Sequence, residues 1–112
     1  MVRVIITRKL EEEISKIFKK QSSEILESFK SLEENPHKGK IVGQVNNIVI
    51  KELKNQSFRF YFITDGFKLK MLKKEELTDL LIKFVRLSNK RDQQKVIDNI
   101  KEILRKIGED GF

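Results

Sequence analysis

Six basic side chains on or beside expected β-strands have the clearest capacity for chemistry: Lys51, Lys54, Arg59, Arg86, Lys90 and Arg91. Arg59 is the most informative, because it interrupts the apolar run at 58–63, where a charge is costly unless it faces solvent or a partner. Such cations facing one cleft could hold adjacent phosphates. An arginine could also stabilise the charge that develops when a ribose 2′-hydroxyl attacks its own 3′-phosphate. The alternative is a salt bridge from Arg59 to Glu52 across a hairpin.

The net charge of +7 is concentrated in the middle of the chain. Residues 36–91 carry thirteen basic and five acidic side chains, a net +8, whereas residues 1–35 are neutral and residues 92–112 carry −1. A basic segment that also carries aromatic residues indicates a surface facing a polyanion. The alternative is a solvated lysine-rich face that binds nothing. A basic turn with His37, Lys38 and Lys40 lies in this region and could contact phosphate, although an idle surface histidine is commoner.

The composition excludes several kinds of site. The chain has 112 residues, no cysteine and one histidine, which rules out disulfides, cysteine-ligated zinc and a two-histidine metal site. It is too short for a two-domain dinucleotide enzyme, and its five glycines form no phosphate-binding loop. We therefore expect one domain over residues 1–112 with no metal, no cofactor and no membrane span, located in the cytoplasm.

Hydrophobic periodicity predicts a change from helices to strands near the single proline. Apolar spacing predicts helices over 8–20 and 23–34, or one kinked helix, with Thr7 as a cap and Asn35-Pro36 as the end. Strands are expected at 2–6, 48–54, 58–63 and 67–72, with Asp65-Gly66 as a hairpin turn. Residues 77–87 fit either a helix or a central strand, and a last helix follows Ser88 and ends at Gly108.

These elements predict an α+β fold, in which a helical hairpin precedes four or five antiparallel strands and a helix follows them. Alternation along 58–63 places Arg59, Tyr61 and Ile63 on one face of the sheet. We expect Lys51, Lys54, Arg59 and Arg91 to lie within one concave basic patch.

The order of these elements and three short motifs resemble the RelE/ParE toxin superfamily. The motifs are Lys51-Glu52-Leu53-Lys54, Phe58-Arg59-Phe60-Tyr61 and Leu87-Ser88-Asn89-Lys90-Arg91. The resemblance implies a small twisted antiparallel sheet packed on an N-terminal helical hairpin. It also favours the strand interpretation of 80–87. Ribosome-dependent members cut messenger RNA in the ribosomal A site, ParE-like members target DNA gyrase, and both are usually neutralised by an antitoxin.

The resemblance also implies roles for individual residues. By position, Lys51, Lys54, Arg59 and Arg91 resemble the catalytic basic residues of RelE-type members. Lys38, Lys40, Arg86 and Lys90 are then expected to bind RNA. The sequence departs from the family at Ile97, where RelE-type members often carry a tyrosine about six residues after the last arginine. The only tyrosine in the chain is Tyr61.

The resulting hypothesis is a RelE-like toxin of a toxin–antitoxin system that inhibits translation. It would be a ribosome-dependent messenger-RNA endoribonuclease or an RNA-binding relative, with an antitoxin, the ribosome and messenger RNA as partners. Any cleavage is expected to be weak without ribosomes and independent of divalent metal. The alternatives are a ParE-like or orphan toxin that binds a protein without catalysis, and a basic nucleic-acid-binding domain with no toxin role.

Overall fold

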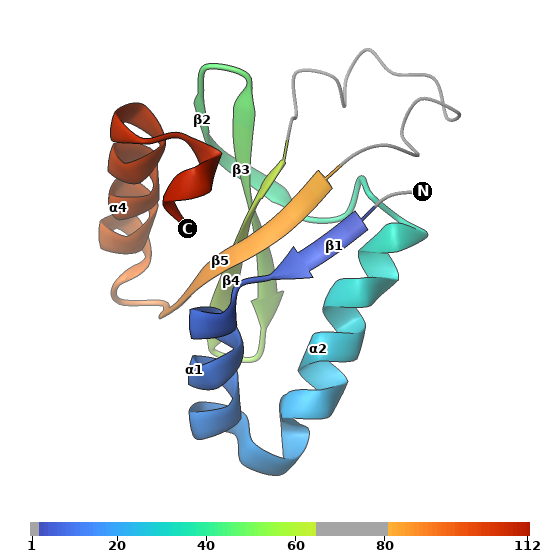
Figure 1. The fold of residues 1–112 in the computed structure, drawn as a ribbon. Coiled ribbons are helices and arrows are strands. Elements are labelled where there is room, and N and C mark those ends of the chain that lie inside the picture. The colour runs from blue at the N-terminus through green and yellow to red at the C-terminus, as the bar shows by residue number, and fades with distance from the viewer. Residues whose placement is uncertain (1–2, 65–80) are drawn as a thin grey trace.

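The computed structural model of the protein describes residues 3–64 and 81–112. Its helices and strands are, in chain order, β1 (Arg3–Ile6), α1 (Arg8–Phe18), α2 (Ser22–Lys30), β2 (Lys40–Val45), β3 (Ile48–Asn55), β4 (Phe58–Thr64), β5 (Leu81–Asn89) and α4 (Gln93–Lys106) (Figure 1). Short 3₁₀ turns follow the helices at η1 (Lys19–Gln21), η2 (Ser31–Glu33) and η4 (Glu109–Gly111). The fold is therefore α+β, with a helical hairpin before most of the sheet and a helix after it, as the periodicity predicts.

The five described strands form one sheet in the order β1-β5-β4-β3-β2. Strands β2, β3, β4 and β5 pair antiparallel with their neighbours, whereas β1 pairs parallel with β5. The sheet is thus mixed rather than wholly antiparallel. After β1 the chain passes through the helical hairpin and enters the opposite edge of the sheet as β2. Strands β3, β4 and β5 then follow in order across the sheet, so the last strand lies beside β1.

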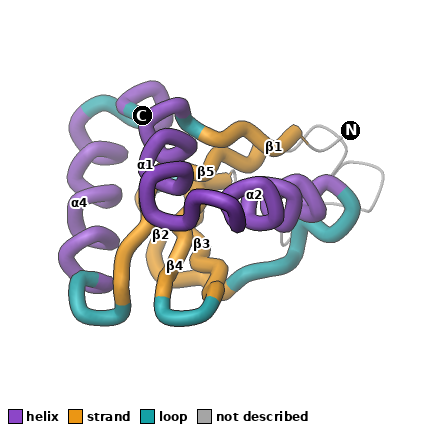
Figure 2. The backbone as a smooth tube through the Cα atoms, turned by 90° about the horizontal axis from the view of Figure 1, so that it is seen from below, coloured by secondary structure: helices purple, strands orange, loops and turns teal. Residues whose placement is uncertain are grey.

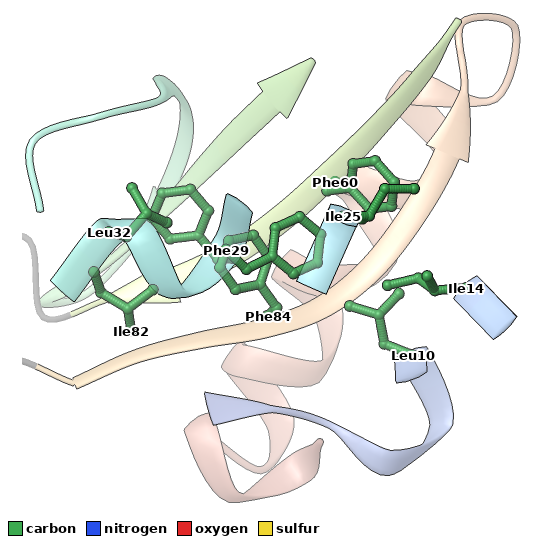
Figure 3. Close-up of a cluster of buried hydrophobic side chains, with 9 residues drawn as sticks. Leu10, Ile14, Ile25, Phe29, Leu32, Phe60, Ile82 and Phe84 are labelled. Carbon is green, nitrogen blue, oxygen red and sulfur yellow. The ribbon is translucent and has the colours of Figure 1, made fainter. Parts of the chain in front are cut away.

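The α1–α2 hairpin packs on one face of the sheet, which we call the hairpin face. Its core contains the fully buried rings of Phe29, Phe60 and Phe84, which are labelled in Figure 3. The Phe62 ring is also fully buried in this core. The rings of Phe29 and Phe84 are stacked, with centroids 3.9 Å apart and planes 8° from parallel. This stack holds helix α2 to β5.

Helix α4 packs on the opposite face, which we call the α4 face (Figure 2). Its core joins Tyr61 and Ile63 of β4 to the apolar stripe of the helix, including Ile97, Ile100 and Leu104. The β4 side chains therefore alternate between two cores, as expected for a strand that is covered on both sides. Because side chains alternate along a strand, the charged residues of the sheet also point toward one or the other of these two covered faces.

Hydrogen bonds from backbone N–H groups to polar side chains mark where the first and last helices begin. Leu10 N donates a hydrogen bond of 3.4 Å to Thr7 Oγ1, so Thr7 caps α1 as predicted. At the other end of the chain, the Asn89 side chain accepts a hydrogen bond of 2.9 Å from Asp92 N and turns the chain into α4. The hairpin breaks at η1, near the polar interruption that begins at Gln21.

The segment that fitted both a helix and a strand is a strand over 81–89, so the helix interpretation of 81–87 is wrong. Strand β2 was not among the expected strands, because its run is short and contains Gly43. The Asp65-Gly66 turn, the strand at 67–72 and the first residues of the 77–87 segment lie outside the described residues.

Candidate nucleic-acid interface

Four of the eight basic residues given site roles from the sequence lie at one end of the sheet, namely Lys54, Arg59, Lys90 and Arg91. Strand β3 ends there at Asn55, strand β4 begins at Phe58 and strand β5 ends at Asn89, and these three residues are register partners. One row further in, Lys54 pairs with Arg59, and Arg59 pairs with Ser88. We call this region the sheet end. Its α4 face carries a polar cluster, and its rim carries exposed cations.

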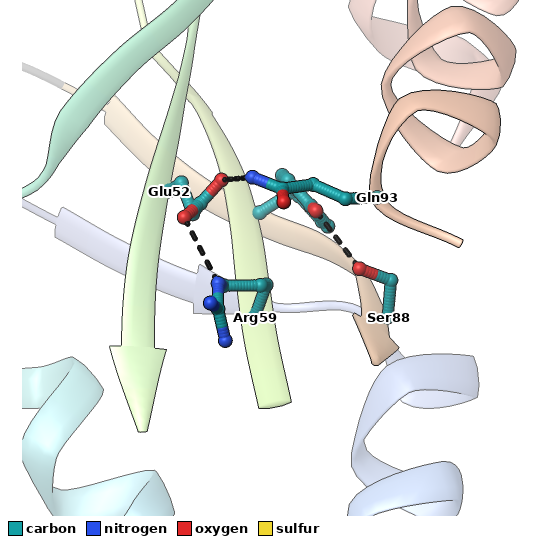
Figure 4. Close-up of polar contacts among 5 residues, drawn as sticks. Glu52, Arg59, Ser88 and Gln93 are labelled. Atoms are coloured by element: carbon teal, nitrogen blue, oxygen red, sulfur yellow. Dashed lines mark hydrogen bonds and ion pairs between the residues drawn. The ribbon is translucent and has the colours of Figure 1, made fainter. Parts of the chain in front are cut away.

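The polar cluster is built around Glu52 (Figure 4). Its Oε1 atom lies 3.4 Å from Arg59 Nε, and its Oε2 atom accepts a hydrogen bond of 2.7 Å from Gln93 Nε2 at the start of α4. The side chains of Arg59 and Glu52 are only 9% and 8% exposed. The cluster therefore links β3, β4 and α4 beneath the surface.

The expected contact of Arg59 with phosphate is not supported by its placement. The guanidinium is buried and paired with Glu52, which is the alternative that the sequence offered. Its Nη1 atom is also buried and has no hydrogen-bond partner in the part of the chain that the structure describes. Gln93 at the start of α4 contacts the same carboxylate, so the charge of Arg59 is compensated by an internal partner and does not face solvent.

The expectation that Lys51 shares a patch with Lys54 and Arg59 is wrong. Lys51 and Lys54 are three residues apart on one strand, so their side chains leave opposite faces of the sheet. Lys51 is 4% exposed on the hairpin face, where its Nζ donates a hydrogen bond of 2.9 Å to the His37 carbonyl oxygen. The ammonium also lies 5.8 Å from the centre of the Phe62 ring. Its role is to attach the turn after α2 to the sheet.

The buried Lys51 makes stability depend on pH. Burial lowers the pKa of Lys51 below its ordinary value of 10.5, so between the lowered pKa and 10.5 the unfolded chain binds more protons than the folded chain. The free energy of unfolding should therefore rise with pH through that window, as the cost of burying the charge is relieved. In urea unfolding from neutral to alkaline pH, the stability of the wild type relative to Lys51→Met should increase. A difference that stays constant would contradict this account of Lys51.

Five basic side chains are exposed either at the sheet end or at the start of the edge strand β2, and we call them the sheet-end basic surface. They are Lys38, Lys40, Lys54, Lys90 and Arg91. Lys40 pairs in register with Glu52 at the start of β2, and Lys90 and Arg91 follow β5 directly. Within residues 3–64 and 81–112, no carboxylate oxygen lies within 4.0 Å of their charged atoms. None of these five charges is therefore neutralised by an ion pair with a described residue.

Arg86 differs from these five residues. A bulge in β5 places it opposite Tyr61 on the α4 face, where its Nη1 donates a hydrogen bond of 2.8 Å to the Val85 carbonyl. Its guanidinium carbon lies 5.1 Å from the centre of the Phe112 ring. The side chain is half-buried, so the structure leaves this predicted RNA-binding residue partly covered.

The only tyrosine in the chain cannot reach a ligand at this surface. Tyr61 is fully buried, and its hydroxyl lies 2.8 Å from Ser88 Oγ. Burial raises the pKa of the Tyr61 hydroxyl, with smaller opposing contributions from Ser88 and Arg59. Ile97 is buried in the core beneath α4. The sheet end therefore offers positive charge, and neither Tyr61 nor position 97 supplies it with an acid–base group.

Gln93 and Ser88 complete the cluster, and sequence reasoning gave neither a role. Ser88 belongs to a recognised motif, but its partner is 27 residues away. Gln93 is 41 residues from Glu52, and only the packing of α4 brings them together. The helix position of Gln93 could be predicted, whereas its contact could not.

Among residues 3–64 and 81–112, no three histidine, cysteine, aspartate or glutamate side chains are grouped so that they could hold a metal ion. No helix in the described ranges is long and apolar enough to cross a membrane. Comparisons with protein-family models, with curated proteins and with solved structures found no match. The resemblance to the RelE/ParE superfamily thus rests on short motifs and on the order of the elements.

Proposed function

We propose that the protein is a RelE-like RNA-binding protein that contacts messenger RNA on the ribosome through the sheet-end basic surface. One observation carries the proposal: the exposed cations Lys54, Lys90 and Arg91 lie at one end of the sheet, with Lys38 and Lys40 exposed at the start of the edge strand β2, and the described residues provide no carboxylate within 4.0 Å of any of them. Such a surface attracts a phosphate backbone without reading its sequence. The ribosome would then supply the orientation of the substrate.

The fold supports this proposal, since a small sheet packed on an N-terminal helical hairpin is what the RelE resemblance implies. The parallel pairing of β1 with β5 departs from the wholly antiparallel sheet of that resemblance. The five surface residues also include Lys54, Lys90 and Arg91, which belong to the motifs behind that resemblance. An acidic antitoxin is the corresponding protein partner, because its carboxylates would compete with RNA for the same cations. A cytoplasmic location follows from these partners.

The buried polar cluster favours binding over efficient cleavage. General acid–base assistance contributes about 10²–10⁴-fold to a rate, and neither the buried Tyr61 nor Ile97 can supply it here. Arg59, which was expected to stabilise the transition state, is paired with Glu52. We therefore expect any cleavage of free RNA to be weak, and unaffected by chelation of divalent metal.

The proposal predicts that RNA affinity depends on where charge is removed. The variant Lys54→Gln/Lys90→Gln/Arg91→Gln lowers the net charge from +7 to +4, and so does the control Lys9→Gln/Lys16→Gln/Lys20→Gln on α1 and η1. Losing three phosphate contacts should weaken binding of a labelled single-stranded RNA about 10–100-fold at about 0.1 M salt. Fluorescence anisotropy in buffer containing EDTA measures this loss, and the control variant should lose far less.

A cell-free translation reaction tests the toxin role. The wild type should inhibit protein synthesis, and the sheet-end variant should lose that inhibition while the α1 control keeps it. Equal RNA binding by both triple variants would overturn the proposal. Inhibition of translation by a protein that binds no RNA would also overturn it, and would favour the protein-binding alternative.

A further inference from the structure

Residues 108–112, which we call the strap, fold back from the end of α4 toward β5 (Figure 1). The reversal occurs at Gly108, whose φ of +92° is a conformation that side chains disfavour. Gly111 then approaches the helix so closely that a Cβ atom there would lie 2.5 Å from Ile103 Cγ2. The two glycines therefore allow the strap to reach the sheet.

The strap contacts two basic side chains on the α4 face of β5. Lys83 Nζ donates hydrogen bonds of 3.2 Å to the carbonyl oxygens of Glu109 and Phe112. The Phe112 ring packs against the α4-face core and lies under the Arg86 guanidinium, 5.1 Å away. Lys83 and Arg86 are the only basic residues of β5, and both contact this one short segment.

These two cations lie on the same strand that leads into Lys90 and Arg91 of the sheet-end basic surface. Strand β5 runs from Lys83 through Arg86 and is followed at once by Lys90 and Arg91. At a rise of about 3.3 Å per residue, Lys83 lies about 23 Å along the chain from Lys90, a span of several nucleotides. Beside Arg86, α4 borders an open depression of about 780 Å³ that is also lined by Asp92, Lys95, Val96, Asp98, Asn99 and Glu102.

We infer that Lys83 and Arg86 form a second phosphate-binding pair on β5, and that the strap withholds it from RNA. This inference rests on the proposed function, because it extends the same binding surface. The strap is held by the two hydrogen bonds from Lys83 and by the packing of the Phe112 ring, and it contains only a single 3₁₀ turn, so it can leave without breaking any pairing between strands. Its departure would lengthen the basic track without rearranging the sheet.

Displacing the strap should strengthen RNA binding. Gly111→Val opens it by collision with Ile103, and a chain ended after Gly108 removes it. Two added phosphate contacts should steepen the dependence of log K on log salt by about 1.4 and raise affinity about 10-fold near 0.1 M salt. Anisotropy with the same labelled RNA measures both changes, and circular dichroism with thermal unfolding selects the variants that remain folded.

The matched variant Lys83→Gln/Arg86→Gln separates this inference from a general loosening of the protein. It should cancel the gain when the strap is displaced, and it should change affinity less than twofold when the strap is intact. A gain that survives this pair, a folded strap variant that binds like the wild type, or a large loss with the strap intact would each overturn the inference.

The sheet-end variant distinguishes the two failures. If Lys54→Gln/Lys90→Gln/Arg91→Gln weakens binding while displacement of the strap changes nothing, only the inference about the strap fails. If neither set of changes alters RNA binding, the proposed function fails as well.

Discussion

Replacing Glu52 by alanine is expected to lower the free energy of unfolding by about 3–5 kcal/mol, because the change leaves the buried Arg59 charge without its partner. The Gln93 side chain would also lose its acceptor. Urea denaturation measures the effect. The matched control is Glu102→Ala, which breaks an exposed ion pair with Lys106 and should cost far less.

The double variant Glu52→Met/Arg59→Met tests whether the pair is only structural. Replacing a buried ion pair with apolar residues of similar volume is often neutral or stabilising, so this variant should recover most of the stability lost by Glu52→Ala. Its RNA affinity should equal that of the wild type, because Arg59 does not belong to the sheet-end basic surface. A folded double variant that no longer binds RNA would show that Arg59 contributes to RNA binding.

Replacing Phe84 by alanine is expected to cost about 3–5 kcal/mol, since its ring is fully buried and stacks on Phe29 at 3.9 Å. The ring also contacts Phe62 at a centroid distance of 4.8 Å, so the resulting cavity would lie between α2 and the two central strands. Thermal or urea unfolding measures the loss. On the same side of the molecule, Ile17 is 45% exposed, and Ile17→Ala should change stability by less than about 0.5 kcal/mol. Similar losses for the two variants would contradict the description of this core.

The secondary structure could largely be predicted because the chain switches period at Pro36. Helices α1, α2 and α4 carry stripes at helical spacing, and β4 carries an alternating aromatic run. Periodicity alone could not assign residues 81–87, since Ile82 and Phe84 are buried on one face of the sheet and Val85 on the other, and they form an apolar run that also suits a helix. The strand that the family resemblance favours is the one observed. Only the pairing of β5 between β1 and β4 decides the question.

The candidate site was less predictable, for reasons that differ between residues. The opposite orientations of Lys51 and Lys54 follow from strand alternation, so the sequence contained that information. The burial of Arg59 depends on where α4 packs, which no local pattern encodes. The position of Arg86 depends on a bulge that shifts the register between Tyr61 and Phe62, and such a bulge has no signature in the residues of β5.

The most direct test of the RNA-binding surface is lysine footprinting on the wild-type protein. An amine-modifying reagent is applied with and without a saturating single-stranded RNA, and the modified positions are read by mass spectrometry. Lys38, Lys40, Lys54 and Lys90 should be protected by RNA, whereas Lys9, Lys16 and Lys20, which are also exposed and lie on α1 and η1, should react as before. Protection of the α1 lysines with none at the sheet end would contradict the account.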